Sequence, residues 1–188
     1  MFENKIILIT GGTGSLGQAL TKKLLTLPIK GIRLLSRNES AQVEMQRYFA
    51  DHANKLSFFI GDIRDYSRLT RALEDVDIVF HTAALKHVPV IEYNPFEAVK
   101  TNVIGTQNIV DACLEQDVEK VIGIGTDKAV SPLNTYGASK LLMEKIFVTA
   151  GNFVNPKKHR TKFTTLRYGN VFGSSGSVVP LWINQIKN

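Results

Sequence analysis

The feature that most constrains the fold of this chain is a repeated alternation of short apolar runs and amphipathic segments. The apolar runs are rich in Ile, Val, Leu and Phe and do not alternate strictly with polar residues, which is typical of strands covered on both faces. They occupy residues 5–10, 32–35, 56–61, 77–83, 120–126 and 162–169. Because parallel strands need long crossover connections, the alternation predicts an α/β fold with a doubly wound parallel sheet and helices on both faces.

Two of the intervening segments have a clear helical pattern. Within residues 65–76, apolar side chains recur at i, i+3, i+4 and i+7 and predict one core-facing stripe, formed by Leu69, Ala72, Leu73 and Val76. A longer helix is predicted from about Pro95, where proline is tolerated, to about Gln116. The last segment begins another helix and stops without a cap, which predicts a truncated chain.

The composition fits one well-cored globular domain. The chain has 188 residues, 44% of them hydrophobic, and its net charge of +6 comes from 23 Lys and Arg against 17 Asp and Glu. Residues 157–160 form the densest basic run. We interpret this run as a solvated loop rather than a nucleic-acid contact, because no aromatic residues lie between its charges. The one cysteine, Cys113, is interpreted as a small buried hydrophobe in a reducing compartment.

The ends and the apolar runs bear on localisation. The N-terminus enters a strand at once and lacks the layout of a signal peptide. No apolar run approaches the ~20 residues needed to span a bilayer. We therefore expect a cytoplasmic protein with neither a membrane nor a nucleic-acid partner, and we expect no metal site.

A glycine-rich loop, TGGTGSLG at residues 10–17, follows the first strand and opens a helix. The first glycine, Gly11, would permit a tight turn, Gly14 would let the backbone approach a pyrophosphate, and Gly17 would let the helix pack on the strand. Backbone N–H groups and the helix dipole would then bind the phosphates. A glycine-rich turn without a ligand is the alternative. The loop predicts a dinucleotide site that also includes Thr13, Ser15 and Leu16.

The second and third strands bear on which dinucleotide binds. An acidic residue at the end of the second strand would select NAD, but Ser36 and Arg37 stand there. A guanidinium suits a 2′-phosphate, so NADP is favoured and NAD stays possible. Asp62 and Ile63 follow the third strand, where Asp62 would meet the adenine, cap a helix N-terminus, or do both.

Two acid–base pairs lie close together in the segment TDKAVSPLNTYGASK. Tyr136 and Lys140 are four residues apart and therefore share one helix face. Tyrosine titrates near ~10 when unperturbed, and a neighbouring ammonium would lower that value enough for a base. The same lysine could bind the nicotinamide ribose. Asp127 and Lys128, just upstream, are not needed for simple alcohol oxidation; the alternative is a solvated loop pair.

These motifs resemble the extended short-chain dehydrogenases/reductases and, more narrowly, the UDP-N-acetylglucosamine 4,6-dehydratases that also invert C5. The resemblance spans essentially the whole chain and is carried by TGGTGSLG, SRNE, FFIGDIRD, HTAALKHVPVIEYNP, KTNVIGTQN, TDKA, YGASK and RYGNVFGSSGSVVP. ALKHVP and TDKA are specific to this branch. The resemblance implies a Rossmann fold in which residues 1–188 form the NADP-binding domain of a longer enzyme whose C-terminal substrate domain is missing.

The resemblance also implies a mechanism. Tyr136 would take the proton of the sugar 4-OH while hydride passes from C4 to NADP, and Lys128 would then remove the acidified C5 proton. Asp127 would protonate the departing 6-hydroxyl, hydride would return to C6, and Thr126 would orient the sugar or Tyr136. Lysine must lose its proton first, and C5-retaining relatives carry glutamate at the position of Lys128.

Further positions follow from the same resemblance. Ala83, Ala84 and Lys86 would lie near the cofactor, with Lys86 also near the sugar, and Asn170 would bind substrate. Asn102 would steady the backbone. Ser175 stands where the family usually has arginine, which weakens the expected phosphate or sugar contacts. Homo-oligomers, and a role in surface polysaccharide or nonulosonate synthesis, are expected.

Two rival functions stay open. A UDP-sugar 4-epimerase would share the glycine loop, Tyr136 and Lys140 but has no use for Asp127 and Lys128. A non-catalytic NAD(P)-binding regulatory module could dispense with the tyrosine, which this chain retains.

Overall fold

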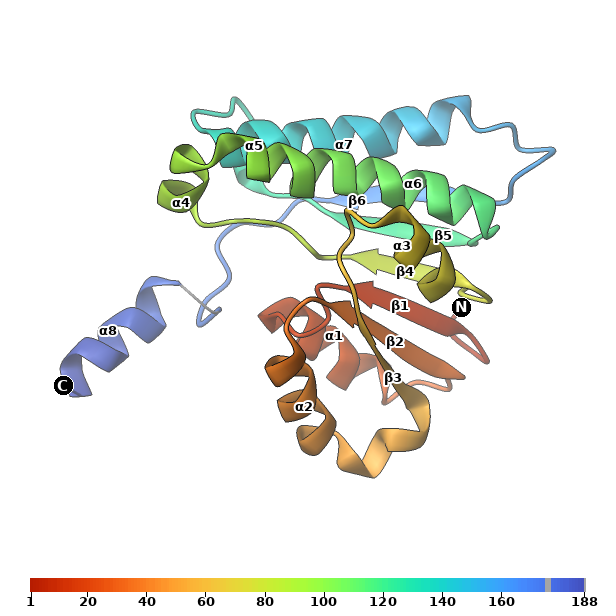
Figure 1. Ribbon diagram of the computed structural model, residues 1–188, viewed down its shortest axis with the longest axis horizontal. Helices are drawn as coiled ribbons and strands as arrows, with labels where there is room; N and C mark the ends of the chain where they lie inside the picture. The colour runs from red at the N-terminus through yellow and green to blue at the C-terminus, as the bar shows by residue number, and fades with distance from the viewer. Residues whose placement is uncertain (175–176, 188) are drawn as a thin grey trace.

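A computed structural model describes residues 1–174 and 177–187. Its centre is a parallel sheet of six strands in the order β3-β2-β1-β4-β5-β6 (Figure 1). The strands are β1 (Ile6–Thr10), β2 (Gly31–Ser36), β3 (Leu56–Ile60), β4 (Ile78–His81), β5 (Lys120–Ile124) and β6 (Lys162–Leu166). The predicted doubly wound α/β fold is confirmed, because the chain builds outward from β1 on one side and from β4 on the other.

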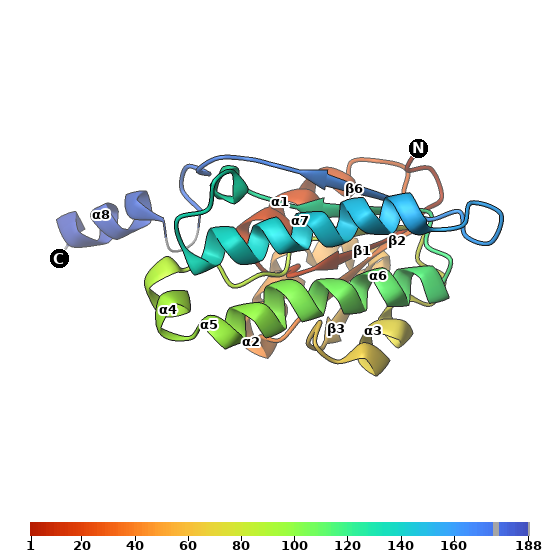
Figure 2. The same ribbon diagram turned by 90° about the horizontal axis from the view of Figure 1, so that it is seen from above.

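Helices connect the strands and cover both faces of the sheet. They are α1 (Ser15–Leu24), α2 (Glu39–Tyr48), α3 (Tyr66–Leu73), α4 (Val88–Tyr93), α5 (Pro95–Ala98), α6 (Gly105–Glu115), α7 (Thr135–Phe153) and α8 (Val178–Lys187). Short 3-10 turns span Ala50–Lys55 and Asp127–Ala129, and a π-helical turn spans Val99–Ile104. Figures 1 and 2 show α8 projecting away from the sheet, while α6 and α7 run side by side across it.

The core has one layer on each face of the sheet, and successive residues of β1 alternate between them. Ile7 and Ile9 pack with α1 and α2, whereas Leu8 packs with α3, α6 and α7. All three are fully buried, and burying such a side chain stabilises the fold by about 1.5–3 kcal/mol. The predicted stripe of residues 65–76 is also buried against the second layer, although α3 itself ends at Leu73.

The strands that end nearest the site are shorter than predicted. β4 ends at His81 rather than at residue 83, β5 at Ile124 rather than 126, and β6 at Leu166 rather than 169. The first residue beyond β4 and the first beyond β5 still bond to a neighbouring strand, since the Thr82 N–H donates to the Thr10 carbonyl at 3.2 Å and the Gly125 N–H to the Leu166 carbonyl at 2.6 Å. Strand-forming composition alone does not reveal where pairing stops.

The predicted helix from Pro95 to Gln116 is interrupted. Pro95 does begin α5 and Gln116 is the C-cap of α6, but the π-helical turn lies between the two helices. The turn holds Asn102, whose side chain hydrogen-bonds both backbone groups of Leu85 instead of facing solvent. Across the described residues, none of the helices combines the length and apolar character that crossing a bilayer would require.

Candidate active site

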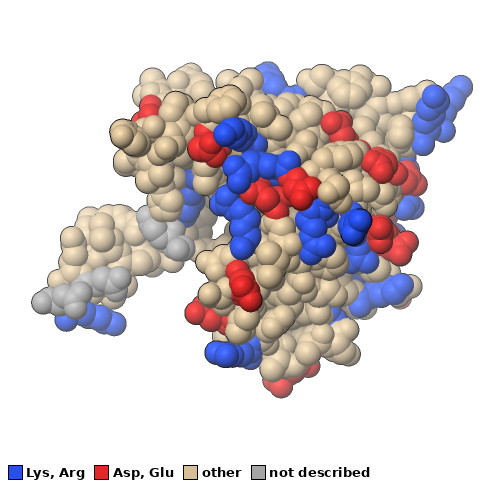
Figure 3. Space-filling view, in the orientation of Figure 1, with Lys and Arg blue, Asp and Glu red and all other residues tan. Residues whose placement is uncertain are grey.

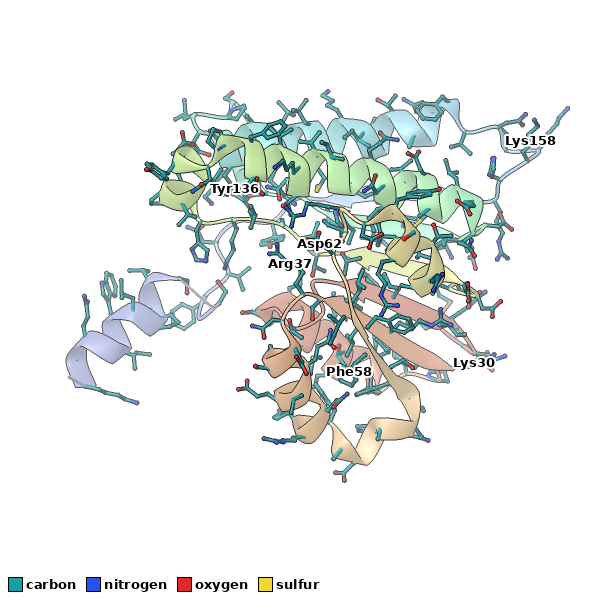
Figure 4. The ribbon with its side chains drawn as sticks, viewed as in Figure 1. Lys30, Arg37, Phe58, Asp62, Tyr136 and Lys158 are labelled. Atoms are coloured by element: carbon teal, nitrogen blue, oxygen red, sulfur yellow. The ribbon has the colours of Figure 1, made fainter. Side chains whose placement is uncertain are left out.

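The candidate site lies at the carboxyl edge of the sheet, at the point where the strand order reverses between β1 and β4. In parallel α/β sheets this edge is where ligands bind, since every connecting loop after a strand meets there. Figure 4 shows Arg37 and Asp62 side by side at this edge, with Tyr136 above them, whereas Lys158 lies at the far end of the molecule.

The glycine loop forms a close connection between β1 and α1. Gly11 has a φ of +67°, a conformation that L side chains rarely adopt, and its N–H donates to the Leu35 carbonyl at 2.8 Å. A Cβ atom on Gly11 would meet the Ala83 backbone at 2.9 Å, so the loop lies directly against the exit of β4. Gly14 is the N-cap of α1 and offers no side chain to its first turn.

The role expected of Gly17 needs correction. We predicted that it lets the helix pack on the strand, but an added Cβ would lie well inside 3.0 Å of the Gly12 backbone, within the loop itself. Gly17 therefore permits the turn between Gly12 and α1. The Gln18 side chain donates to the Thr13 carbonyl at 2.9 Å and holds the loop in place. Ser15 and Leu16 follow as the first residues of α1.

At the end of β2, Ser36 is buried and Arg37 is exposed. The Ser36 hydroxyl accepts a hydrogen bond from the Gln42 side chain at 2.9 Å. The Arg37 side chain is 57% exposed, and its guanidinium lies 3.8 Å from the carboxylate of Asp62. A long exposed contact of this kind leaves the guanidinium available to an anion.

Asp62 is held by arginine. The Arg64 guanidinium donates to it at 2.7 and 2.9 Å, and the Arg64 N–H donates to it at 2.9 Å. Partial burial raises the pKa of Asp62, but the hydrogen bonds from Arg64 outweigh burial and keep the pKa below its usual value. Arg64 also pairs with Glu97 at 3.1 Å. Figure 3 shows acidic and basic side chains interleaved over the middle of the face in view.

The structure excludes the capping alternative for Asp62 and places the side chain of Ile63 in the core. The N-cap of α3 is Asp65, which accepts from the Arg68 N–H at 3.0 Å, and not Asp62. The side chain of Ile63 is buried and lies against Gly105, so only its backbone can meet a ligand. Asp62 precedes the helix by several residues, and a sequence alone does not show which of two nearby aspartates reaches the first turn.

Tyr136 and Lys140 lie on α7, as their spacing predicts, but they do not act on one another as expected. Lys140 is 4% exposed, and its Nζ atom donates to the Ile124 carbonyl at 2.5 Å and to the Met143 sulfur at 3.0 Å. Burial lowers the pKa of Lys140 to about 8. The lysine thus points to the end of β5.

The pKa of Tyr136 is raised rather than lowered. Burial raises it most, the hydrogen bond with the Thr126 side chain lowers it in part, and the charge of Asp127 raises it further. The predicted stabilisation of the phenolate by Lys140 is therefore absent in this arrangement, because the ammonium group is hydrogen-bonded elsewhere.

Asp127 and Lys128 belong to a hydrogen-bonded line of side chains that begins at Thr126, next to Tyr136. The Thr126 hydroxyl donates to the Asp127 carboxylate at 3.0 Å. Lys128 Nζ donates to the same carboxylate at 3.2 Å and to the Asn170 side chain at 2.9 Å. Hydrogen bonds from Lys128 and then Thr126 hold the pKa of Asp127 below its usual value.

The remaining predicted positions occupy the loops around this line. Ala83, Ala84 and Lys86 follow β4, with Lys86 exposed, and Asn170 follows β6. Ser175, where we noted the departure from arginine, lies outside the described residues.

Sequence reasoning missed two groups at this edge. Glu92 of α4 accepts from the Thr135 N–H at 2.6 Å and so caps α7 just before Tyr136, together with the Asn134 N-cap. His81, at the end of β4, is buried between two threonine hydroxyls. A histidine inside an apolar strand was the available signal for the second group.

Comparison with known proteins now defines the family. Residues 7–188 match the family described as "Polysaccharide biosynthesis protein". The chain belongs to this polysaccharide biosynthesis family. It is 53% identical over 184 residues, 97% of this chain, to a UDP-N-acetylglucosamine 4,6-dehydratase (inverting) of Campylobacter jejuni, of which it covers 54%. It is 47% identical over its whole length to a UDP-glucose 4-epimerase of Rickettsia conorii, of which it covers 55%.

Solved structures agree on the fold of this family member. The structure of Pen from Bacillus thuringiensis superimposes with a TM-score of 0.96 at 45% identity, over 100% of this chain and 58% of that chain. A dTDP-glucose 4,6-dehydratase of Streptomyces venezuelae with bound NAD shares the fold, with a TM-score of 0.79 over 97% of this chain and 62% of that chain. The chain spans about half the length of the curated relatives it matches.

Proposed function

We propose that this polysaccharide biosynthesis protein carries the catalytic half of a UDP-N-acetylglucosamine 4,6-dehydratase that inverts C5. The observation that supports it most is that the hydrogen-bonded side chains of Thr126, Asp127 and Lys128 lie next to Tyr136. Alcohol oxidation needs the tyrosine, whereas elimination of water needs a further base and acid. Residues 1–188 would form the cofactor-binding and catalytic domain, and the C. jejuni relative supports the substrate class.

The glycine loop fits a nicotinamide dinucleotide. Gly14 leaves the first turn of α1 open to backbone approach, and the lack of a side-chain cap leaves that end of the helix suited to a pyrophosphate. Arg37 favours NADP, since its guanidinium is exposed beside the adenosine end of the site. The negative charge of Asp62, which Arg64 already pairs, does not oppose a 2′-phosphate strongly. When bound, the nicotinamide would accept hydride from C4 of the sugar and return it to C6.

Tyr136 would serve as the base toward the sugar 4-OH once its pKa falls. In the present arrangement its pKa is raised and Lys140 is bound to the Ile124 carbonyl. A ribose hydroxyl beside Lys140 would compete with that carbonyl and draw the ammonium toward the phenol. An ammonium near the phenolate stabilises the charged form and lowers the pKa.

Asp127 and Lys128 together already carry the one proton that their two roles require. Both roles need a neutral amine and a protonated carboxyl, and the structure has an ion pair with Nζ and Oδ1 3.2 Å apart. Moving one proton from Lys128 to Asp127 converts the ion pair into the acid and base. A sugar that excludes water from this pair favours the neutral form, because desolvation penalises charges.

Lys128 could then remove the C5 proton, and Asp127 could protonate the departing 6-hydroxyl. Asn170 would orient the lysine, since its side-chain oxygen accepts from Nζ at 2.9 Å. Lys86, exposed after β4, would bind the sugar or its phosphates. Reprotonation of C5 from the opposite face would give inversion.

The test is incubation with UDP-N-acetylglucosamine and NADP in deuterated water, followed by mass spectrometry. We expect a 4-keto-6-deoxy product that has lost one water and carries deuterium at C5. Lys128→Ala should reduce both signals by about 100-fold or more, while Lys158→Ala, in the distant basic loop, serves as the matched control. Persistence of C5 exchange in Lys128→Ala would show that Lys128 is not the base.

A UDP-sugar 4-epimerase is the second candidate, supported by the R. conorii relative. Such an enzyme would use Tyr136 and Lys140 but not the Asp127–Lys128 pair. In that case Lys128→Ala would retain epimerisation and the wild type would release no water. Absence of any reaction with nucleotide-sugars would instead favour a non-catalytic nucleotide-binding module.

Self-association is proposed as well. Leu142 and Phe153 of α7 are exposed apolar side chains that line a groove between α6 and α7, and a second copy could cover them. Sedimentation velocity of the wild type and of Leu142→Asp would test it, since the charge should shift the protein toward monomer.

A further inference from the structure

His81 is a buried histidine with a partner on each ring nitrogen. It is the last residue of β4 and is 1% exposed. Its Nδ1 atom lies 2.8 Å from the hydroxyl of Thr10, the last residue of β1, and its Nε2 atom lies 3.2 Å from the hydroxyl of Thr106 in α6. The Phe147 ring of α7 packs edge-on against the imidazole at 5.9 Å.

Counting hydrogens assigns the tautomer of this ring. The Thr106 hydroxyl donates its single proton to the Asn102 carbonyl at 2.8 Å, so it can only accept from His81, and Nε2 must carry a hydrogen. The Thr10 hydroxyl accepts from the Ala83 N–H at 3.3 Å, which leaves its own proton to donate to Nδ1. Only a neutral ring protonated at Nε2 gives both threonine hydroxyls and both ring nitrogens a hydrogen-bond partner.

The electrostatic environment agrees with a neutral ring. Burial and, to a lesser extent, the positive charge of Lys140 together lower the pKa of His81 to about 3. A second charge in the same buried layer would be costly, since no carboxylate of the network is there to pair it.

Further hydrogen bonds connect His81 to α7, the helix that carries Tyr136. Asn102 accepts from the Leu85 N–H at 2.8 Å and donates to the Ser139 hydroxyl at 3.0 Å. Ser139 in turn donates to the backbone carbonyl of Tyr136 at 2.8 Å. A continuous series of hydrogen bonds therefore runs from the end of β1, through β4 and the π-helical turn, to α7.

We propose that His81, held as the neutral Nε2–H tautomer, is a positioning residue that fixes the glycine loop relative to Tyr136. At one end this series of hydrogen bonds holds Thr10 and Ala83, which contact the glycine loop. At the other end it holds the backbone of Tyr136. Fully satisfied buried networks of this kind are rigid. The proposal rests on the proposed function in that Tyr136 and the glycine loop are taken to hold the two reacting partners.

The first test concerns the tautomer and needs no cofactor. Long-range proton–nitrogen spectra of the uniformly ¹⁵N-labelled chain resolve the ring nitrogens of its 4 histidines, and loss of one set in His81→Gln assigns His81. We expect an Nε2–H ring that does not titrate between pH 5 and pH 8, given about 6.5 for an ordinary histidine. A ring protonated at Nδ1, or one that gains charge in this range, would overturn the proposal.

The second test concerns positioning. Ser139→Ala removes only the last link to Tyr136, and Thr101→Val is its matched control in the same network region, because the buried Thr101 hydroxyl has no hydrogen-bond partner among the described residues. The readouts are the ¹³Cζ resonance of Tyr136 and the dissociation constant of NADPH from fluorescence titration. We expect Ser139→Ala to shift the resonance and to weaken NADPH binding about tenfold, while Thr101→Val changes neither.

His81 itself is tested by rescue. His81→Phe fills the site without hydrogen bonds, and His81→Gln restores a donor toward Thr106. We expect both readouts to move further in His81→Phe than in His81→Gln. If Ser139→Ala and both His81 variants match the Thr101→Val control, the positioning role is refuted. If His81→Phe does not fold, the result for Ser139→Ala alone decides whether the role holds. Failure of the wild type to bind NADPH would count against the proposed function and leave the Tyr136 readout intact.

Discussion

A single added methyl group at Gly137 should disable the site without unfolding the protein. Gly137 follows Tyr136 in the first turn of α7, and its ideal Cβ position falls well inside 3.0 Å of the Lys128 carbonyl oxygen and 3.0 Å from Pro132. Real Cβ atoms do not approach so closely, so something must shift in Gly137→Ala. The Lys128 oxygen belongs to the backbone, so the 3-10 turn Asp127–Ala129 has to move away from α7.

The magnitude follows from the size of that displacement. To bring the new methyl to ordinary contact, the turn must move by roughly 1 Å, and a misplacement of about 1 Å near reacting groups costs about 100-fold in rate. A 100-fold loss corresponds to about 2.7 kcal/mol of activation free energy. Lys128 and Asp127 belong to this turn. We therefore expect the rate of water elimination to fall more than the affinity for NADPH.

Gly151 supplies the matched control on the same helix. A methyl group there would meet only the Phe163 carbonyl oxygen, at 3.9 Å, which is ordinary contact. Replacing a helical glycine by alanine adds about 1 kcal/mol of helix propensity, so Gly151→Ala should be slightly stabilised and fully active. The assay is dehydration followed by mass spectrometry, with urea unfolding to measure stability. Gly137→Ala with elimination within threefold of the Gly151→Ala control would refute the reasoning.

Three further predictions concern stability and cofactor choice. Thr101→Val should raise the free energy of unfolding by about 1 kcal/mol, measured by urea denaturation, because it removes a buried hydroxyl that lacks a partner among the described residues. Arg37→Asp should reverse the preference from NADPH to NADH by at least about tenfold in the ratio of dissociation constants, whereas an unchanged ratio would exclude Arg37 from the 2′-phosphate site. Burial lowers the pKa of Lys140 from 10.5 to about 8, so the unfolded chain binds more protons between these values and stability should rise with pH from about 8 to about 10.5. The rise should approach about 3 kcal/mol relative to Lys140→Met, and equal pH slopes in the two proteins would contradict it.

Local patterns sufficed to predict the fold class. Six apolar runs separated by helical segments leave few alternatives to a doubly wound parallel sheet, since sterics and chain connectivity allow crossovers of only one hand. The glycine loop was likewise readable, because its spacing and its place between strand and helix are both local. Tyr136 and Lys140 share a helix face for the same reason: four residues of helix set that relation wherever the helix lies.

Contacts between distant segments decided the rest. Lys128 meets Asn170 across 42 positions, and His81 meets Thr10 across 71, distances along the chain that no local period encodes. The direction of Lys140 also depended on tertiary structure, since the Ile124 carbonyl that binds its ammonium belongs to a strand, and burial then set the pKa values of both Lys140 and Tyr136. The sequence by itself determined which groups stand at the edge of the sheet, because strand ends are local. Packing alone decided which of them touch and in which protonation state, because hydrogen bonds and desolvation act through space.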